Sequence, residues 1–552
     1  MIRRRIRVGF ILLLCAVLFF GCTQKSTSVP AEVQEIGLVL DIDPICLDAQ
    51  IATEQSALIV INQVLEGLVR LDENGRAMPA LAESWEISED GRTYTFRLRD
   101  AQWSDGSKIT ADDIAYSFKR VLNYSFDSPY TYQLYPIQYA FEAKNGEDRN
   151  GIKTTKTIDD VGITAADENT LIITLEEPAS YFLQLLANPA FIPAKRSFVE
   201  EFGNDYALLK ENMACSGPFI VAEWVEDEYI VLEKNEYYWD SENVKLTKIT
   251  CPIQMKNNEA VKMFESGEVQ LITLSQSYVG QFAGGENYVQ VTQPLTWYLQ
   301  FNCEHEYLSN VNLRTAFAMA VDKEAFIADV RKGFGVVAQT LTPKSMSVDG
   351  VYLFDEAEHD VATFDVEGAQ AKLVEALGEL NITKEDLNAS ITILGGQGSA
   401  YESILVFLAE QININLGLNI EVEKVTYAER IGRYESGEYA ITYAGMQNYY
   451  ADPVCNLRSL AAGASNNFTK FSNGDYDALI EAILNTKPPF GEEADEARGQ
   501  LYVDAEAIIA EQVPLYPLYS PVDAYVVDLK LKDVLFQPAQ TNVDLRYAWL
   551  SQ

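Results

Sequence analysis

Apolar and polar positions alternate along parts of this chain and repeat with helical spacing in the segments between them. Residues Thr93–Leu98 alternate polar and apolar side chains with period two, which is typical of a half-buried strand. The Asp90-Gly91 pair just before them predicts a hairpin turn. Thr110 and Asp113 then have the spacing of a capping box, which predicts the start of a helix.

The same succession of strands and helices continues to the end of the chain. Strand-like residues return after Asp523, and a Pro-rich turn at Lys487–Pro489 precedes an acidic helix. Strands that alternate with helices indicate α/β domains. The pattern predicts strands at Leu171–Leu175, Ile230–Glu233, Ile391–Leu394 and Ile420–Val425, and helices at Asn312–Val330, Ala369–Leu377 and Tyr401–Leu416.

The N-terminal residues have the order of an export signal. Four arginines within Arg3–Arg7 precede the apolar run Val8–Phe20, and the small residue Gly21 comes before Cys22. The run is shorter than the about 20 residues that a membrane-spanning helix needs, so a permanent span is the poorer interpretation. The cysteine resembles that of a bacterial lipobox, although two phenylalanines replace the usual leucine and small residue before Gly21. We expect cleavage before Cys22 and a lipid on its sulfur; a plain secretory signal with an incidental cysteine is the alternative.

The composition is that of a large, acidic, globular protein. A chain of 552 residues, 48% of them hydrophobic, exceeds one hydrophobic core, so we expect two or three domains. The formal net charge of −39 repels nucleic acid and anionic lipid headgroups, and the chain has no basic stripe. We interpret this charge as a source of solubility; a weak attraction for cationic ligands is the alternative.

Cysteine and histidine are too few for most metal and catalytic sites. His305 and His359 are the only histidines, which argues against histidine-based metal binding, Ser-His-Asp catalysis and a histidine pH switch. No CxxC pair is present, so neither a zinc site nor a disulfide scaffold is indicated, and we expect no metal and no cofactor. A single bridge stays open among the cysteines beyond the signal, which are Cys46, Cys215, Cys251, Cys303 and Cys455.

Motifs of known enzymes are absent or incomplete. The chain has no GxSxG or HExxH motif, and its adjacent acidic pairs are typical of solvated helix surfaces. Gly395–Gly398 follows a predicted strand but lacks the dinucleotide fingerprint and a Walker lysine, so we interpret it as a loop. Asn473–Asp477 has no downstream EF-hand pattern and predicts a turn with a helix cap. We therefore do not expect an enzyme.

A series of motifs runs in order through nearly the whole chain. It begins with Leu-Glu-Gly-Leu-Val-Arg-Leu-Asp at Leu65–Asp72. The following pieces are Pro79–Trp85, Tyr94–Arg99, Trp103–Gly106, Thr110–Asp113, Ser216–Phe219, Asn235–Trp239, Leu313–Ala316 and Tyr450–Pro453. In this order they closely resemble the oligopeptide-binding proteins of ABC importers, a family that also contains dipeptide- and nickel-binding members. The resemblance covers Ile36–Gln552.

The resemblance implies an α/β fold of the periplasmic-binding-protein type, with two lobes joined by a hinge and an extra domain inserted in the first lobe. A ligand that contacts both lobes stabilises the closed form and shifts the population towards it. The Trp103–Gly106 motif falls in the inserted domain, where we expect a turn between strand and helix. The implied division is a signal peptide at 1–21, a tether at 22–35, a discontinuous first lobe at 36–74, 197–296 and 521–552, an inserted domain at 75–196, and a second lobe at 297–520.

A strand of the second lobe binds the peptide backbone in this family, and the resemblance places it at Gly445, Met446 and Gln447. Backbone hydrogen bonds hold an extended peptide and tolerate any side chain. The sequence departs from the family here. Met446 stands at the usual tryptophan position, and Tyr449 stands where an aspartate pairs with the α-amino group of the peptide. Asp452 or tyrosine faces are the candidates to replace that aspartate.

Tyrosines replace arginine or tryptophan at three other positions of the implied site, Tyr427, Tyr434 and Tyr443. They are either ordinary packing residues or the walls of a pocket for a larger, apolar or N-blocked ligand. The further candidates are Glu54 and Gln55, in a first-lobe loop that meets the ligand in the family, and Trp297 and Asn302, which suit the cleft or the core equally.

The resemblance implies an extracellular solute-binding lipoprotein that delivers oligopeptides to the permease of an ABC importer. It implies a monomer without nucleic-acid partners, held through Cys22 on the outer face of the bacterial cytoplasmic membrane or located in the periplasm. Two alternatives stay open. The first is the same fold with another ligand, such as a glycosylated or opine-like compound, a metal chelate or a signalling peptide. The second is an extracellular enzyme or a structural surface protein.

Overall fold

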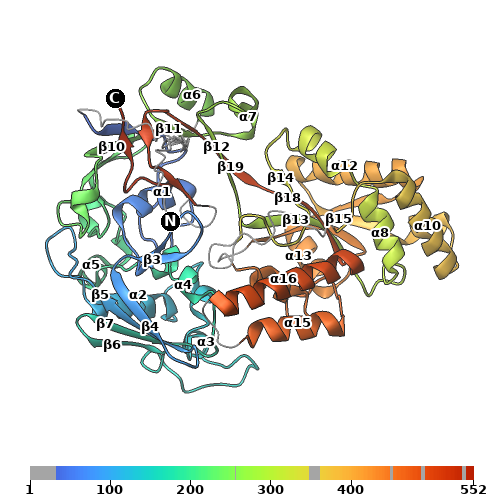
Figure 1. Ribbon diagram of the computed structural model, residues 1–552, viewed down its shortest axis with the longest axis horizontal. Coiled ribbons are helices and arrows are strands. Elements are labelled where there is room, and N and C mark those ends of the chain that lie inside the picture. The colour runs from blue at the N-terminus through green and yellow to red at the C-terminus, as the bar shows by residue number, and fades with distance from the viewer. Residues whose placement is uncertain (1–32, 255, 347–360, 448–451, 487–491, 538–542) are drawn as a thin grey trace, which may run out of the picture.

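The computed structural model describes residues 33–254, 256–346, 361–447, 452–486, 492–537 and 543–552 (Figure 1). Its helices and strands form three groups, each with its own large cluster of buried apolar side chains. Two of the groups are mixed lobes of helices and strands, and the third is inserted in the first lobe. The α/β fold class expected from the sequence is therefore confirmed.

The first lobe contains two sheets that bring together distant parts of the chain. The N-terminal strand β1 (Glu35–Gly37) pairs in parallel with β10 (Lys248–Pro252). Helix α1 (Gln55–Val64) buries one face against this lobe. The larger sheet has the order β1-β10-β9-β8, with β9 at Tyr229–Lys234 and β8 at Phe219–Val225; the smaller has the order β11-β19-β12, at Leu271–Thr273, Val522–Val527 and Tyr288–Thr292.

The inserted group has an antiparallel sheet covered by helix α2 (Ala111–Leu122). The predicted hairpin is confirmed, because the turn before Thr93 places Gly91 at a φ of 72°. The predicted capping box is confirmed as well. The Thr110 hydroxyl accepts from the Asp113 N–H, and the Asp113 carboxylate accepts from the Thr110 N–H. The strand order is β4-β5-β7-β6, at Ala82–Ile87, Thr93–Leu98, Thr170–Thr174 and Ile163–Asp167.

A buried ion pair ties this inserted group to the first lobe. Arg120 of α2 donates to both carboxylate oxygens of Asp48, at 2.7 and 3.2 Å, and to the side-chain oxygen of Gln50 at 2.8 Å. The amide group of Gln50 in turn donates to the carbonyl oxygens of Ser117 and Ala190. Because both charges are shielded from water, the contact resists separation, and the inserted group and the first lobe form a common unit.

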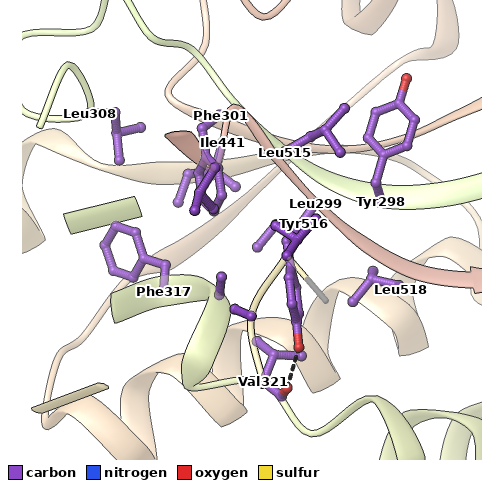
Figure 2. Packing of buried hydrophobic residues seen from close by; sticks show 14 of the residues in the cluster. Tyr298, Leu299, Phe301, Leu308, Phe317, Val321, Ile441, Leu515, Tyr516 and Leu518 are labelled. Carbon is purple, nitrogen blue, oxygen red and sulfur yellow. Dashed lines mark hydrogen bonds between the residues drawn. The ribbon is translucent and has the colours of Figure 1, made fainter. Parts of the chain in front are cut away.

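The second lobe is built on a six-stranded sheet, seen at the right of Figure 1. Its core packs helix side chains against strand side chains. Phe301 stacks on Phe317, and the Tyr516 hydroxyl donates to the Val321 carbonyl at 3.1 Å, as Figure 2 shows. The strand order is β14-β18-β13-β17-β15-β16, at Val336–Val337, Leu515–Ser520, Leu295–Phe301, Ile441–Gln447, Thr392–Gly396 and Glu421–Val425. The helices of this lobe include α8 (Val311–Met319), α10 (Val366–Leu380), α12 (Ser399–Leu416), α13 (Tyr427–Ser436), α14 (Val454–Leu457), α15 (Gly474–Leu484) and α16 (Glu492–Gln512).

Two predictions about this lobe were wrong. The single helix expected over Asn312–Val330 is divided after α8, because the Asp322 side chain accepts from the Ala325 N–H and starts a new short helix. Gly395–Gly398 is not simply a loop, since its first two glycines are the last residues of strand β15. Helix α10, helix α12 and strand β16 agree with their predicted segments, and Asn473 caps α15 as expected. The turn at Lys487–Pro489 lies outside the described residues.

Two extended connections join the lobes. Strand β12 of the first lobe leads directly into β13 of the second, and β18 of the second leads directly into β19 of the first. Between them, the Gln293 N–H donates to the Pro521 carbonyl at 2.9 Å, and the Gln293 side chain donates to Asp523 at 2.9 Å. In the described part of the chain no helix is both long and apolar enough to cross a membrane.

Candidate functional site

The carboxyl ends of three strands meet at one edge of the second-lobe sheet. Strand β15 pairs in parallel with both β16 and β17, so Gly396, Val425 and Gln447 end their strands at the same edge. Ligands of α/β sheets bind at such edges, where loops and helix N-termini surround the strand ends. Helices α12 and α13 both begin here, directly after β15 and β16.

Strands β15 and β17 separate towards this edge. They pair only through Ile393 and Leu394, which lie opposite Ile441 and Thr442. Beyond Thr442, strand β17 keeps its partner β13 on one side as far as Gln447, but among the described residues it has no strand partner on the β15 side. The predicted peptide-binding residues Gly445–Gln447 therefore lie on a strand with one open side.

Gly445 is required by the packing of an aromatic side chain across this strand. A Cβ atom at this position would lie 2.7 Å from the indole ring of Trp297, which is too close for any side chain. The indole stacks on Tyr443 with ring centroids 4.8 Å apart, and Tyr401 packs edge-on against both rings. The Tyr443 hydroxyl is hydrogen-bonded to the Tyr519 hydroxyl at 3.2 Å, so Tyr443 is held within the lobe. Burial raises the pKa of Tyr443 well above its ordinary value.

Tyr434 also packs into the second lobe. Its hydroxyl donates to the side-chain oxygen of Gln300 at 3.1 Å, and its ring contacts Phe468 with centroids 4.4 Å apart. Burial raises the pKa of Tyr434 to about 12. Asn302 donates through its amide to the carbonyls of Gly437 and Tyr439, which gives it a structural role in this lobe.

Asp452 is buried at the contact between the second lobe and the inserted group. Its carboxylate accepts from the Tyr502 hydroxyl at 2.7 Å, from the Val454 N–H at 2.9 Å and from the Ser180 hydroxyl at 3.4 Å. A cavity of about 30 Å³ beside it, lined in part by Tyr181 and Tyr502, is only large enough for a water molecule. Asp452 already has three partners, which leaves little capacity for a ligand ammonium group.

The remaining predicted residues are exposed, half-buried or outside the described part of the chain. Tyr427, the first residue of α13, is 74% exposed. Met446 is half-buried against the second-lobe core. In the first lobe, Glu54 precedes α1, and Gln55 donates to the Tyr525 hydroxyl at 3.5 Å. Tyr449 and the side chain of Gln447 lie outside the described residues, as do Cys22 and the whole signal segment.

One residue at this edge was missed by the sequence analysis. Arg430 of α13 is 8% exposed, and its guanidinium carbon lies 5.5 Å from the ring centroid of Tyr401 and 5.7 Å from that of Tyr427. No sequence signal singled it out, because its environment depends on two helices that start at separate strand ends.

Metal binding and thiol chemistry find no support among the described residues. They contain no cluster of three His, Cys, Asp or Glu side chains that could hold a metal ion. No disulfide joins the cysteines at Cys46, Cys215, Cys251, Cys303 and Cys455, so the single bridge left open by the sequence is not formed. Burial raises the pKa of the Cys251 thiol to about 12, which suppresses the reactive thiolate at neutral pH.

Two α/β lobes joined by two extended crossings, with an extra domain inserted in the first, define a two-lobe solute-binding protein. The sequence matches the family "Bacterial extracellular solute-binding proteins, family 5 Middle" over residues 76–468. The chain belongs to this family, whose members serve transport rather than catalysis.

Individual relatives agree with this assignment. The dipeptide-binding protein DppE of Bacillus subtilis is 29% identical over 508 residues, which cover 92% of this chain and 90% of that protein. The unliganded open form of the periplasmic murein tripeptide-binding protein MppA superimposes with a TM-score of 0.83 at 25% identity, over 96% of this chain and 99% of that one. The peptide-bound OppA of Listeria monocytogenes gives 0.66 at 27% identity, over 95% and 100%. The arrangement of the lobes is therefore more similar to the open form than to the peptide-bound one.

Proposed function

We propose that this chain is the lipid-anchored solute-binding component of an ABC importer and that it binds oligopeptides between its two lobes. In this proposal Cys22 carries the lipid, and the protein works as a monomer on the outer face of the bacterial cytoplasmic membrane. It delivers the closed, loaded form to the permease. The family membership and the names of its peptide-binding relatives support the proposal.

The open side of β17 is the single observation that carries the ligand class. Within the part of the chain that the structure describes, residues Tyr443–Gln447 have a strand partner on the β13 side only. An extended peptide adds to such a strand through main-chain hydrogen bonds, which recognise a backbone and not a particular side chain. A sugar or a steroid lacks the repeated N–H and C=O groups that this side can bind.

Closure explains how the first lobe takes part. A peptide held on β17 that also contacts Glu54 or Gln55 binds the closed form more tightly than the open one, so it shifts the equilibrium towards closure. The similarity to an unliganded open form agrees with a protein whose lobes are apart before the ligand binds. Tyr427, exposed at the same sheet edge, supplies an aromatic wall.

A thermal-shift series with peptides of two to ten residues tests the ligand class. A peptide that binds the folded protein stabilises it and so raises its Tm as the peptide concentration increases. The free energy of unfolding rises by about 2.7 kcal/mol at a peptide concentration of a hundred times Kd. No rise with any peptide in the series would reject oligopeptides and favour the same fold with a different ligand. Mass spectrometry of whatever co-purifies with the exported protein identifies the natural ligand directly.

The anchor is tested separately from the ligand. Replacing Cys22 by serine should release the exported protein from the membrane fraction into the medium or the periplasm, because one acylated residue is the only proposed attachment. A variant that stays in the membrane fraction would contradict the lipid anchor without affecting the peptide proposal.

A further inference from the structure

Arg430 is a buried charge that has no ionic partner in the described part of the chain. Only 8% of its surface is exposed, and among the described residues its side chain contacts aromatic rings but forms no ion pair and no hydrogen bond with a carboxylate or carbonyl group. Some side-chain atoms of the described residues have neither solvent contact nor a hydrogen-bond partner. The nitrogen atoms of Arg430 are not among them. The guanidinium group is therefore desolvated in part, yet still reachable from the sheet edge.

Two other buried arginines of the described structure have carbonyl or carboxylate partners. Arg314 donates to the carbonyl oxygens of Leu308 at 2.6 Å and Val513 at 2.9 Å. Arg546 pairs with Glu66 at 2.6 Å. Taking a charge out of water without a partner is unfavourable, so an unpaired buried arginine is an exception that calls for a partner. The absence of an ionic partner among the described residues is unusual in a chain with 81 acidic side chains, because carboxylates that could pair with Arg430 are abundant.

The surroundings of Arg430 also favour an anion. Strand β15 ends at Gly396, where a Cβ atom would lie 3.8 Å from the Cδ and Nε atoms of Arg430. Helix α12 starts just beyond, and its N-cap is Gly398, which has no side chain to accept from the first N–H groups of the helix. Helix N-termini attract negative charge through these free N–H groups and the helix dipole. The guanidinium and the helix start thus act on the same small region.

We propose that Arg430, together with the uncapped start of α12, binds a carboxylate of the ligand. This inference rests on the proposed function. A peptide added to the open side of β17 lies beyond Leu394, and hence next to Gly396, against which the Arg430 side chain packs. The planar guanidinium matches a carboxylate through two parallel hydrogen bonds, and the rings of Tyr401 and Tyr427 lie next to it.

The test compares free-acid and C-terminally amidated forms of the same alanine peptides, titrated into the purified lipoprotein in detergent. In the unmodified protein, amidation should weaken binding by about 10- to 100-fold, because a charge-assisted pair is lost. In Arg430→Gln the free-acid and amidated peptides should bind equally. Arg430→Lys should recover only part of the preference for the free acid, since lysine keeps the positive charge but lacks the planar guanidinium group. Arg433→Gln is the matched control. It removes a positive charge from the same helix, where Arg433 pairs with Glu423, and should behave like the unmodified protein.

A second readout separates binding from folding. Removing an unpaired buried charge should raise the Tm of the unliganded protein in Arg430→Gln while it weakens binding, whereas loss of an ordinary packing residue lowers both. An amidated peptide that regains affinity when it carries one glutamate, in the unmodified protein and not in Arg430→Gln, would support the proposal and assign a side-chain carboxylate.

The failure of this inference is distinguishable from failure of the proposed function. Peptides that bind with the same affinity as acid and as amide would overturn the carboxylate site and leave peptide binding intact. If no peptide binds, N-acetylated amino acids and inorganic phosphate serve as probes. A Tm rise with the N-acetylated amino acids that Arg430→Gln abolishes would support the site. A rise with phosphate alone, or with neither probe, would overturn it.

Discussion

At the residue scale, the polar groups that the described structure buries are mostly matched with partners. Asp452 shows this clearly, because its carboxylate joins the Tyr502 hydroxyl, the Val454 N–H and the Ser180 hydroxyl. The sequence suggested Asp452 as a partner for a ligand ammonium group. Its contacts favour a structural role at the junction of the second lobe and the inserted group.

Replacement of Asp452 by alanine separates these two roles. We expect a loss of stability of about 1–3 kcal/mol, because the buried Tyr502 hydroxyl loses its acceptor. Ser180→Ala removes only the 3.4 Å contact and should cost less than about 1 kcal/mol. Denaturant unfolding measures both. An unchanged stability together with weaker peptide binding would instead make Asp452 a ligand residue.

Glu506 gives a prediction about pH. It is fully buried in α16 and accepts from the N–H groups of Leu341 and Thr342, at 3.1 and 2.7 Å. Burial raises the pKa of its carboxyl group above the ordinary 4.5. Between 4.5 and the raised pKa the folded state binds more protons than the unfolded state, so stability falls as the pH rises through this window.

Unfolding of the unmodified protein and of Glu506→Gln between pH 4 and 8 tests this sign. The stability of the unmodified protein relative to the variant should decrease with rising pH, by about 1.4 kcal/mol for each unit by which the pKa is raised. Parallel curves would show that Glu506 does not titrate differently in the two states.

At the element scale, the second-lobe sheet is shaped by a close contact between two strands. Gly445 of β17 lies under the indole of Trp297 of β13, which stacks on Tyr443. Neither strand by itself reveals this contact. It arises because the register places Trp297 directly opposite Gly445.

Gly445→Ala should therefore destabilise the protein by about 1–3 kcal/mol through overpacking. Trp297→Leu should make room for the added methyl group, so the double variant should be more stable than the sum of the single losses predicts. Gly378→Ala in α10, where the new Cβ meets open space, is the control and should be neutral or stabilising by up to about 1 kcal/mol. If the losses of stability of the two single variants simply added in the double variant, direct contact between the new methyl group at position 445 and the side chain at position 297 would be contradicted.

At the scale of the whole molecule, the Arg120–Asp48 pair makes the inserted group a part of the first lobe. Arg120→Met should cost about 3–5 kcal/mol, because it leaves Asp48 buried and unpaired. The exposed Arg196, which pairs with Glu200 on the surface, is the control, and Arg196→Gln should change stability by less than about 1 kcal/mol. Calorimetry checks both values, and equal small effects would mean that the two units are joined by other contacts.

The two crossings between the lobes determine the motion that can follow ligand binding. Gln293, Pro521 and Asp523 hold the crossings side by side, so we expect the lobes to turn about this pair and not to slide past each other. A saturating peptide should lower the radius of gyration measured by X-ray scattering. The same curve with and without a peptide whose binding calorimetry has established would contradict closure.

Local features of the fold could be predicted from the sequence because short-range interactions determine them. The Asp90-Gly91 turn and the Thr110–Asp113 capping box depend only on residues a few positions apart. The break in the helix at Asp322 was missed, because the apolar spacing continues across it while a single aspartate cap starts a new helix. The series of motifs predicted the family and the strand Gly445–Gln447, since each motif is a run of consecutive residues and can be recognised without the fold.

The sequence by itself determined the alternating elements, the acidic surface and the family of this protein. Only the tertiary structure decided which side chains share the sheet edge. Tyr401, Tyr427 and Arg430 come from two helices that start at different strand ends, and the open side of β17 exists because β15 turns away after Leu394. These relations depend on strand order and register, which are set by contacts between residues far apart in the chain.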